Sequence, residues 1–582
     1  MREYLQKIIS RFTNRQFLFL TAIIIAVWAG LTAVALKAFV HYVTRGIHTL
    51  SESYSWIYLV TPVIGILITV LFVRYVIREK LRAGTWHVLL AIAKKSSKLD
   101  KKETYSYAVT SAFTVGMGGS VGLESPIVQT GSAIGSTFAS FFPMGYRDRT
   151  LMLACGAAAG IAAAFNAPIT GVLFALEVLL VDISVSSFIP LLIAGAVGAL
   201  CSKIILKEGI LLSFTHVKEF DYHNIPFYML LGVLCGMVAV YYVRTLLRTQ
   251  DTMGKYLPGT FTRLFVGGLL LGGLIWVFPS LFGDGYSTVM ALAEQQPGSL
   301  FENSFISRFE DKQFVLIITV FVLALVKVFA VAFTLGTGGN GGNFAPSLFV
   351  GACLGFAFSG LLVMAGFERV TVANFTLVGM AGVLTGVFHS PLTGIFLIAE
   401  ATGGYELMIP LMIVAALSSA VARFLKQSSL DETILHRQAS NFSFDKDTQL
   451  LARLSMTDCI EKDFSPVSTN STLRKLVDVI AHSKRNIFPV VDEAGQLHGV
   501  IALEDIRETM FNTNLYDSVS VNELMRPPQV TATIDEEMSS VMEKFDKSTV
   551  WNIPVLDGGR YVGFISKSNI FSNYRKRLKR EL

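Results

Sequence analysis

Two glycine-rich stretches decide the fold of this chain: TVGMGGSVGLESPIVQTGSAIG at residues 114–135 and TLGTGGNGGNFAPSLFVGACLG at residues 334–355. They align without a gap at a constant offset of 220 residues. The paired positions include six glycines and one proline: Gly116/Gly336, Gly118/Gly338, Gly119/Gly339, Gly122/Gly342, Pro126/Pro346, Gly131/Gly351 and Gly135/Gly355. Such agreement at a fixed spacing indicates an internal duplication.

A second pair of stretches extends the duplication. GAAAGIAAAFNAPITGVLFALE, from residue 156, matches GMAGVLTGVFHSPLTGIFLIAE, from residue 379, at an offset of 223 residues. This match places Glu177 opposite Glu400. We therefore expect a tandem repeat over roughly 17–205 and 225–425, inside a domain that covers 17–440.

The composition places this repeat in a lipid bilayer. The chain has 582 residues, of which 52% are hydrophobic and only 16% are charged. An apolar run of about 20 residues is long enough to cross a membrane as a helix. Runs of this kind occur at 17–40, 57–77, 227–243, 264–282 and 314–335. They predict an all-α, multi-pass domain with about ten or more membrane-embedded helices.

Charge sets the expected orientation. The segment 1–16 carries four basic residues and is followed by a long apolar run without a small-residue cleavage site, so we expect it to be retained and cytoplasmic, most simply at a cell inner membrane. Residues 94–103, before the first glycine stretch, hold five lysines against two acids, whereas residues 302–312 have no positive excess. The two repeats are therefore predicted to have opposite topology.

Several functions are disfavoured by the same composition. The net charge of +6 is spread through loops and tails, which indicates membrane orientation and no nucleic-acid partner. Five cysteines without a CxxC spacing predict neither a disulfide nor a metal site. No Walker motif or catalytic triad is found, so we expect no enzymatic activity and no required cofactor.

Beyond residue 450 the composition becomes that of a soluble protein, and it also repeats. RNIFPVVDEAGQLHGVIALEDI, from residue 485, resembles VWNIPVLDGGRYVGFISKSNI, from residue 550. Each stretch predicts a strand, a turn with glycine, a second strand and a helix. We expect two α/β modules, at 454–512 and 521–577, that form a cytoplasmic C-terminal tail.

The glycine stretches have the chemistry of an anion site. Backbone N–H groups at a helix N-terminus can bind an anion without a fixed positive charge, and glycine lets that backbone come close. Pro126 and Pro346 suit the first turn of a helix, so each stretch predicts a loop that leads into a broken helix. Glu124 interrupts the first stretch, where a carboxylate at membrane depth indicates function. The alternative is a glutamate at a helix start that faces water.

These motifs resemble those of the CLC chloride channels and transporters. GLESP is similar to that family's GxEGP gating motif, GGNFAP to its GxFxP motif, and the stretch around Asn166 and Glu177 also looks like the family. The tail resembles the paired cystathionine-β-synthase (CBS) modules of many CLC proteins. The resemblance implies a homodimer in which each subunit carries chloride and Glu124 is the external gate. It implies a central anion site that includes Gly122, Leu123, Gly342, Asn343, Phe344 and Ala345.

Three departures from the family pattern leave the mechanism open. The family's GSGIP-like segment corresponds to RAGTWHV at 82–88, where Ala83, Gly84 or Thr85 would line the site. The family's inner tyrosine falls on Asp431, and its inner proton-relay glutamate falls on Val178. Because valine cannot carry a proton, proton-coupled antiport and passive conduction both remain. Fluoride export and a non-transporting nucleotide sensor are weaker alternatives.

Other polar residues are expected to be mainly structural. Glu177 has an equivalent in Glu400 and is expected to serve packing. Lys327 lies in an apolar run, where it either attracts anions or bonds helix-end carbonyls. His87 and His389 are expected to be polar residues at helix ends.

The tail contains incomplete signs of an adenine nucleotide site. By resemblance, CBS pairs place a hydroxyl and an acid of GhhTxxD-like runs at the phosphate and ribose. GVIALED keeps Asp505 but lacks the hydroxyl, and GFISKSN keeps Ser566 but has Asn569 in place of the acid. A purely structural or dimer-stabilising tail is the alternative.

Overall fold

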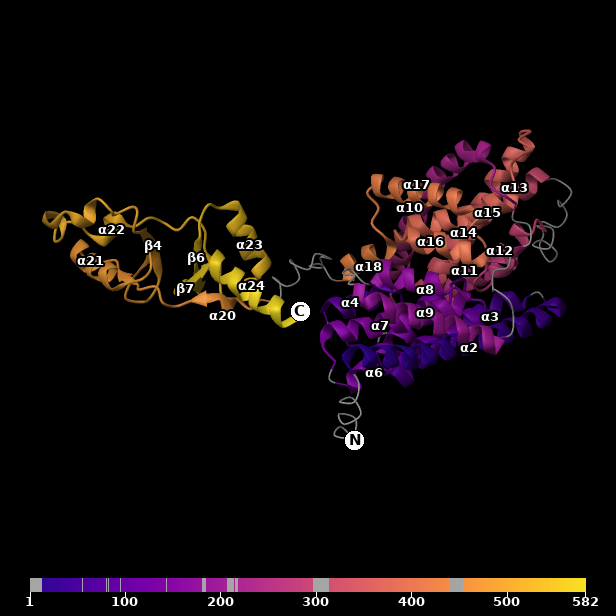
Figure 1. The fold of residues 1–582 in the computed structure, drawn as a ribbon, viewed down its shortest axis with the longest axis horizontal. Coiled ribbons are helices and arrows are strands. Elements are labelled where there is room, and N and C mark those ends of the chain that lie inside the picture. The colour runs from indigo at the N-terminus through magenta and orange to yellow at the C-terminus, as the bar shows by residue number, and fades with distance from the viewer. Residues whose placement is uncertain are drawn as a thin grey trace. The chain divides into compact units, whose positions relative to one another are not determined.

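The computed structural model describes residues 13–54, 56–79, 81, 83–94, 96–142, 144–179, 185–206, 214, 218–296, 313–438 and 454–581. The chain divides into two compact units, Met1–Ser440 and Asn441–Leu582 (Figure 1). The first unit is helical, and the second combines helices with strands (Figure 1). Nearly all of the predicted segment 1–16 lies outside the described residues, since these begin at Thr13.

The first repeat contains eight α-helices among its described residues. They are α2 (Asn14–Ser53), α3 (Ile57–Phe72), α4 (Trp86–Lys94), α5 (Glu103–Gly116), α6 (Glu124–Phe141), α7 (Tyr146–Phe165), α8 (Pro168–Phe174) and α9 (Val185–Leu206), with π-helical turns η1 (Val73–Ile77) and η2 (Ala175–Leu179). A capping box starts α2, because Thr13 Oγ1 accepts from Gln16 N–H at 3.4 Å while Gln16 Oε1 accepts from Thr13 N–H at 3.0 Å.

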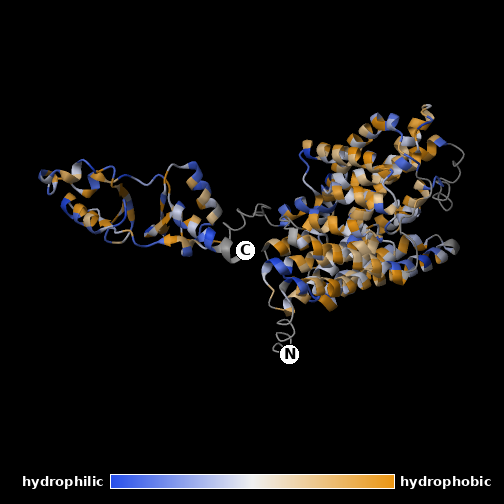
Figure 2. Cartoon of the chain, in the orientation of Figure 1, coloured by the Kyte–Doolittle hydropathy of each residue, from blue (hydrophilic) through white to orange (hydrophobic). Residues whose placement is uncertain are grey.

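The second repeat follows the same order. Its helices are η3 (Tyr222–Asn224), α10 (Ile225–Tyr256), α11 (Thr260–Val277), η4 (Pro279–Leu281), α12 (Tyr286–Ala293), α13 (Gln313–Gly336), α14 (Phe344–Met364), α15 (Val372–Phe388), α16 (Pro391–Ala401) and α17 (Met408–Phe424), and α18 (Leu430–Gln438) closes the unit. Among the described residues, eight helices are long and apolar enough to cross a membrane, and four apolar helices are shorter. The strongly apolar character of this unit is visible in Figure 2.

Glycine allows the central helices of each repeat to touch. Helix α6 packs on α7, and α14 packs on α15. A Cβ atom at Gly131 would collide with the carbonyl oxygen of Gly156, and a Cβ atom at Gly351 would collide with that of Gly379. The same pair of contacts thus appears at equivalent places in the two repeats. This explains why glycine is needed at these positions.

The two repeats meet at equivalent residues. Gly122 N–H donates to Gly342 carbonyl oxygen at 2.9 Å, and Gly342 N–H donates to Gly122 carbonyl oxygen at 2.8 Å, in an antiparallel bridge. Ser120 N–H donates to Thr334 Oγ1 at 3.0 Å, and Asn340 N–H donates to Thr114 Oγ1 at 3.1 Å.

Reciprocal bonds between equivalent residues of antiparallel segments are what a local two-fold axis generates. The prediction of two inverted repeats with broken helices is confirmed. Both breaks lie at this axis, because α5 ends at Gly116 and α6 begins at Glu124, while α13 ends at Gly336 and α14 begins at Phe344.

The second unit contains two small sheets. Its elements are α20 (Met456–Cys459), β1 (Ile460–Glu461), β2 (Val467–Ser468), α21 (Leu473–His482), β3 (Ile487–Val491), β4 (Leu497–Ala502), η7 (Thr509–Phe511), η8 (Thr513–Leu515), α22 (Val521–Leu524), β5 (Ala532–Thr533), α23 (Met538–Lys547), β6 (Asn552–Asp557), β7 (Arg560–Ser566) and α24 (Lys567–Glu581). The strand orders are β2-β3-β4 and β1-β7-β6-β5. In each sheet a short strand pairs in parallel with the first strand of a hairpin.

Candidate functional site

Glu124 stands at the first position of α6, where the first broken helix resumes. Its side chain is buried, with 1% of the residue exposed. The carboxylate Oε1 accepts a hydrogen bond from the hydroxyl of Tyr286 at 2.7 Å. Oε2 is buried and has no hydrogen-bond partner among the described residues. A buried carboxylate oxygen that lacks a donor is costly, so this atom marks a functional position.

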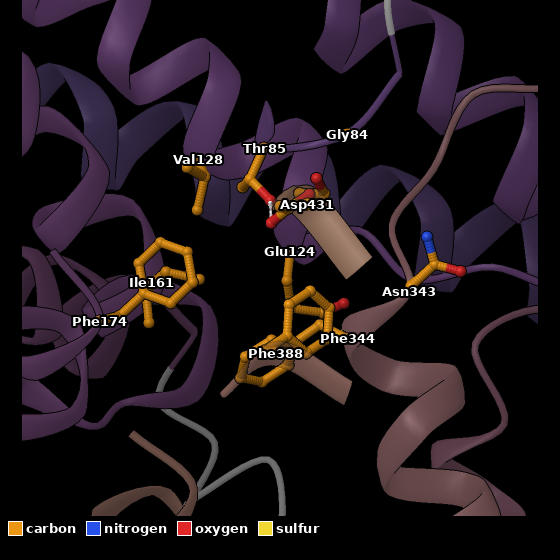
Figure 3. A pocket seen from close by; sticks show the side chains of 11 residues that line it. Gly84, Thr85, Glu124, Val128, Ile161, Phe174, Asn343, Phe344, Phe388 and Asp431 are labelled. Atoms are coloured by element: carbon orange, nitrogen blue, oxygen red, sulfur yellow. Dashed lines mark hydrogen bonds between the residues drawn. The ribbon is translucent and has the colours of Figure 1, made fainter. Parts of the chain in front are cut away.

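Glu124 shares a pocket of about 320 Å³ with a second acid, Asp431 (Figure 3). The lining consists of Gly84, Thr85, Glu124, Ser125, Val128, Ile161, Phe174, Asn343, Phe344, Phe388 and Asp431. Figure 3 shows the labelled side chains of Glu124, Phe344 and Phe388 close together, with Thr85 and Asp431 joined by a hydrogen bond. The pocket therefore combines residues from both repeats and from α18.

The pocket includes six of the ten residues predicted for the gate, the anion site and its inner end. These are Gly84, Thr85, Glu124, Asn343, Phe344 and Asp431. Gly122 and Gly342 instead form the bridge between the repeats. The carbonyl oxygen of Ala83 accepts from Trp86 Nε1 at 2.8 Å, while Leu123 and Ala345 are buried at the adjacent helix starts. These last five positions stay predicted neighbours of the anion and are not among the lining residues.

The sequence argument missed much of the apolar lining. Phe388 ends α15, and its equivalent Phe165 ends α7. Both rings lie against Phe344, with centroid distances of 5.9 Å and 5.7 Å. Phe174 also approaches Phe344, at 6.3 Å. The repeat alignment already paired Phe165 with Phe388, so this signal was available but had been assigned to architecture.

Asp431 lies in the first turn of α18, with 6% of the residue exposed. Its Oδ2 accepts a short hydrogen bond from the Thr85 hydroxyl, and its Oδ1 accepts from the Trp86 backbone N–H at 3.3 Å. The start of α4 is thereby tied to the start of α18. The acid is not turned away from the pathway, because it contributes to the pocket lining.

Two buried lysines lie outside the lining. Lys37 donates to the carbonyl oxygen of Ala164 and lies 5.1 Å from the centroid of the Phe165 ring. It is within electrostatic reach of Glu124. Lys327 donates to the carbonyl oxygen of Gly283 at 3.2 Å, so the carbonyl-bonding interpretation of this residue describes its contacts. Positive charge therefore sits behind the pocket walls.

Glu177 and Glu400 cap helices of the opposite repeat. Glu177 Oε1 accepts from Leu392 N–H at 2.9 Å, and its Oε2 accepts from the backbone N–H and the hydroxyl of Thr393, both at 2.8 Å. Glu400 repeats this pattern with Ile169 N–H at 3.0 Å and with the N–H and hydroxyl of Thr170 at 2.8 and 2.6 Å. A role in packing therefore accounts for both acids, as predicted.

The two histidines singled out in the sequence have ordinary polar environments. His87 lies near the start of α4, with its Nδ1 at 3.4 Å from the Tyr107 hydroxyl and 3.5 Å from Glu103. His389 ends α15 in a left-handed conformation with φ of 56°, and Asn166 ends α7 in the same way with φ of 53°. Both observations agree with helix-end positions.

The candidate nucleotide residues of the tail are held by other protein groups. Asp505 forms an ion pair with Arg526 at 3.2 Å. The Ser566 hydroxyl donates a short hydrogen bond to Glu461, and Asn569 Nδ2 donates to the carbonyl oxygen of Cys459 at 3.0 Å. An incoming nucleotide would have to replace these contacts.

Comparison with known proteins identifies the membrane unit. The family model described as "Voltage gated chloride channel" matches residues 65–423, and the CBS domain model matches residues 456–512 and 521–576. The chain belongs to this chloride channel (CLC) family. As a CLC protein it is an integral membrane anion transporter or channel with two CBS domains.

Its relatives include proteins named as channels and as exchangers. The "Voltage-gated ClC-type chloride channel ClcB" of Escherichia coli is 31% identical over 331 residues, which cover 56% of this chain and 73% of ClcB. The "H(+)/Cl(-) exchange transporter ClcA" of Yersinia pestis is 29% identical over 331 residues, which cover 56% of this chain and 66% of ClcA. Relatives of both kinds therefore match the membrane unit of this CLC protein.

Solved structures have the same fold. A slow cyanobacterial Cl⁻/H⁺ antiporter matches with a TM-score of 0.64 and 20% identity, covering 74% of this chain and 99% of that chain. A eukaryotic CLC transporter matches with a TM-score of 0.62 and 18% identity, covering 95% of this chain and 97% of that chain. The fold prediction is confirmed for the inverted repeats and for the strand-containing tail.

Proposed function

We propose that this CLC protein moves chloride across a membrane and that Glu124 gates the pathway. The observation that carries the proposal is the Glu124 carboxylate, which is buried in the pocket between the repeats and has one oxygen without a donor. A negative side chain at this place competes with an anion for the helix N-termini. When it is protonated it loses that competition, and an anion can take its place.

The pathway needs no fixed positive charge on its lining. The first-turn N–H groups of α6 and α14 point along the helix axes toward the break between the repeats. Lys37 lies behind the wall, within electrostatic reach of Glu124. Such an arrangement attracts an anion without trapping it in a strong ion pair.

Chloride efflux from proteoliposomes tests this function. Wild type, Glu124→Gln and Glu124→Ala are compared with Glu79→Gln, whose carboxylate lies outside the pocket and pairs with Lys102 at 2.9 Å. We expect flux in all four proteins, with the two Glu124 variants faster and less sensitive to pH than the other two. Absence of flux in the wild type and in both Glu124 variants would reject the proposal.

The reversal potential under a pH gradient decides between proton-coupled antiport and passive conduction. A potential that follows the pH gradient would establish exchange, and one that ignores it would establish a passive pathway. The same preparation reports the fluoride-to-chloride flux ratio. A ratio far above one would replace chloride by fluoride as the main substrate.

We infer a homodimer with one pathway in each subunit and with both termini in the cytoplasm. The pocket supports this inference because one chain supplies its whole lining. Co-assembly of wild-type and Glu124→Gln subunits tests it: independent pathways give the average of the two parent fluxes. Cysteine labelling of the tail in sealed vesicles reports its side of the membrane.

A further inference from the structure

Asp431 is the one ionisable residue besides Glu124 among the described residues that line the pocket. Both of its carboxylate oxygens accept from neutral donors, the Thr85 hydroxyl and the Trp86 backbone N–H. A carboxylate that faces an anion pathway repels the anion, and burial makes its charge expensive. The geometry therefore sets two acids against the passage of one anion.

No other ionisable side chain described in the surrounding elements neutralises Asp431. Helix α18 packs mainly on α4 and α15. Helix α15 has no ionisable residue in its sequence. On α4 the described ionisable side chain is His87, which is occupied by Tyr107 and Glu103. The other ionisable residues of α18 are Glu432, His436 and Arg437, of which Glu432 lies 3.8 Å from His436 and Arg437 pairs with Asp251 at 2.9 Å.

A structural role alone does not explain an acid at this position. A side chain that caps the start of α18 and anchors Thr85 needs an acceptor oxygen, which asparagine also provides without a charge. An acid is worth its burial cost if the protein uses both protonation states. The position at the start of the last helix before the tail places it at the tail side of the pathway.

We propose that Asp431 is a proton-binding inner gate, which opens the tail side of the anion pathway when its carboxyl group is protonated. The proposal rests on the proposed chloride transport. Val178, at the place of the family's inner proton relay, is apolar and cannot carry a proton. A proton from the tail side can instead bind directly on the anion pathway, which leaves Glu124 and Asp431 as its two proton-binding sites.

The test isolates the inner gate by removing the outer one. Chloride efflux is measured from about pH 7.5 to about pH 5.5 for Glu124→Ala, Glu124→Ala/Asp431→Asn and the matched control Glu124→Ala/Glu432→Gln. Asparagine keeps the acceptor oxygen of the capping contact, and Glu432 is the adjacent acid on the same helix. We expect acid to raise the flux of the first and third proteins on the order of tenfold, as a single titrating carboxyl allows. The second protein should be fast and independent of pH.

A second variant keeps the acid in place. Thr85→Val removes the donor to the charged carboxylate, so in the Glu124→Ala background acid activation should occur at higher pH. An unchanged pH profile in both the Asp431→Asn and Thr85→Val proteins would overturn the inner gate while leaving the chloride transport intact. Absence of flux in every protein would overturn the proposed function and, with it, the inner gate.

Discussion

The reciprocal caps at Glu177 and Glu400 give a stability prediction that follows from the structure. Each carboxylate accepts three hydrogen bonds at the start of a helix in the opposite repeat. Loss of a helix cap costs about 0.5–2 kcal/mol, and a hydrogen bond to a charged group is worth about 1.5–3 kcal/mol. The desolvation of the carboxylate offsets part of the sum. Glu400→Ala should therefore destabilise the membrane unit by about 2–4 kcal/mol.

The symmetry makes the prediction sharper than its magnitude. Because the bond pattern at Glu177 repeats that at Glu400, Glu177→Ala should cost the same to within about 1 kcal/mol. The midpoint of thermal unfolding in detergent, followed by the amount of monodisperse protein, should fall by roughly 3–6 °C in each variant. Glu406→Ala removes an exposed acid of the same region and serves as the control.

Two results would refute this reasoning. A large loss of stability in one variant and none in the other would show that the two caps are not equivalent. Alternatively, Glu177→Ala could keep wild-type stability but change the coupling of chloride to protons. Glu177 would then belong to the transport machinery, and its hydrogen bonds to α16 would be incidental.

Three further predictions concern the gate and the tail. Tyr286→Phe removes the donor to Glu124 and should raise chloride efflux at neutral pH on the order of tenfold, because a charge-assisted hydrogen bond of about 1.5–3 kcal/mol no longer holds the gate; unchanged efflux would contradict this. Lys37→Met should lower the apparent chloride affinity measured by concentration-dependent efflux, with no change expected for a variant of the exposed Lys255. Burial acts to raise the pKa of Glu536, but hydrogen bonds from Lys544 and Ser540 outweigh it and hold the pKa below 4.5. The stabilisation from Glu536 is therefore present above pH 4.5 and is lost as pH falls through the folded-state pKa, which hydrogen exchange of α23 in the full chain should detect and Glu536→Gln should abolish.

The backbone architecture was open to prediction because the chain states it twice. The offset of 220 residues aligned Gly122 with Gly342 before any contact was known, and these residues form the bridge between the repeats. Glycine and proline at fixed spacing constrain the backbone directly, so their pattern survives in the sequence. The same alignment paired Glu177 with Glu400, whose equivalent contacts follow from their equivalent positions.

The pocket lining was less accessible to prediction because it depends on side chains brought together from distant segments. Ile161, Val128 and Phe174 are apolar residues in apolar helices, and nothing in their local sequence distinguishes a pocket wall from a lipid-facing or core position. Tyr286 belongs to α12, which lies outside both glycine stretches. Its hydroxyl becomes informative only when its contact with Glu124 is seen.

Function in this chain is concentrated where the two repeats differ. The residues that hold the repeats together are equivalent on both sides, as Gly122 and Gly342 illustrate. Glu124, by contrast, has Phe344 as its equivalent, so one half supplies the charge and the other supplies an aromatic wall. Asp431 lies in α18, after the second repeat, and it reaches the pocket through Thr85 of the first. A symmetric scaffold would offer the anion two identical ends, and these two acids at unequal positions are what can give the pathway a direction.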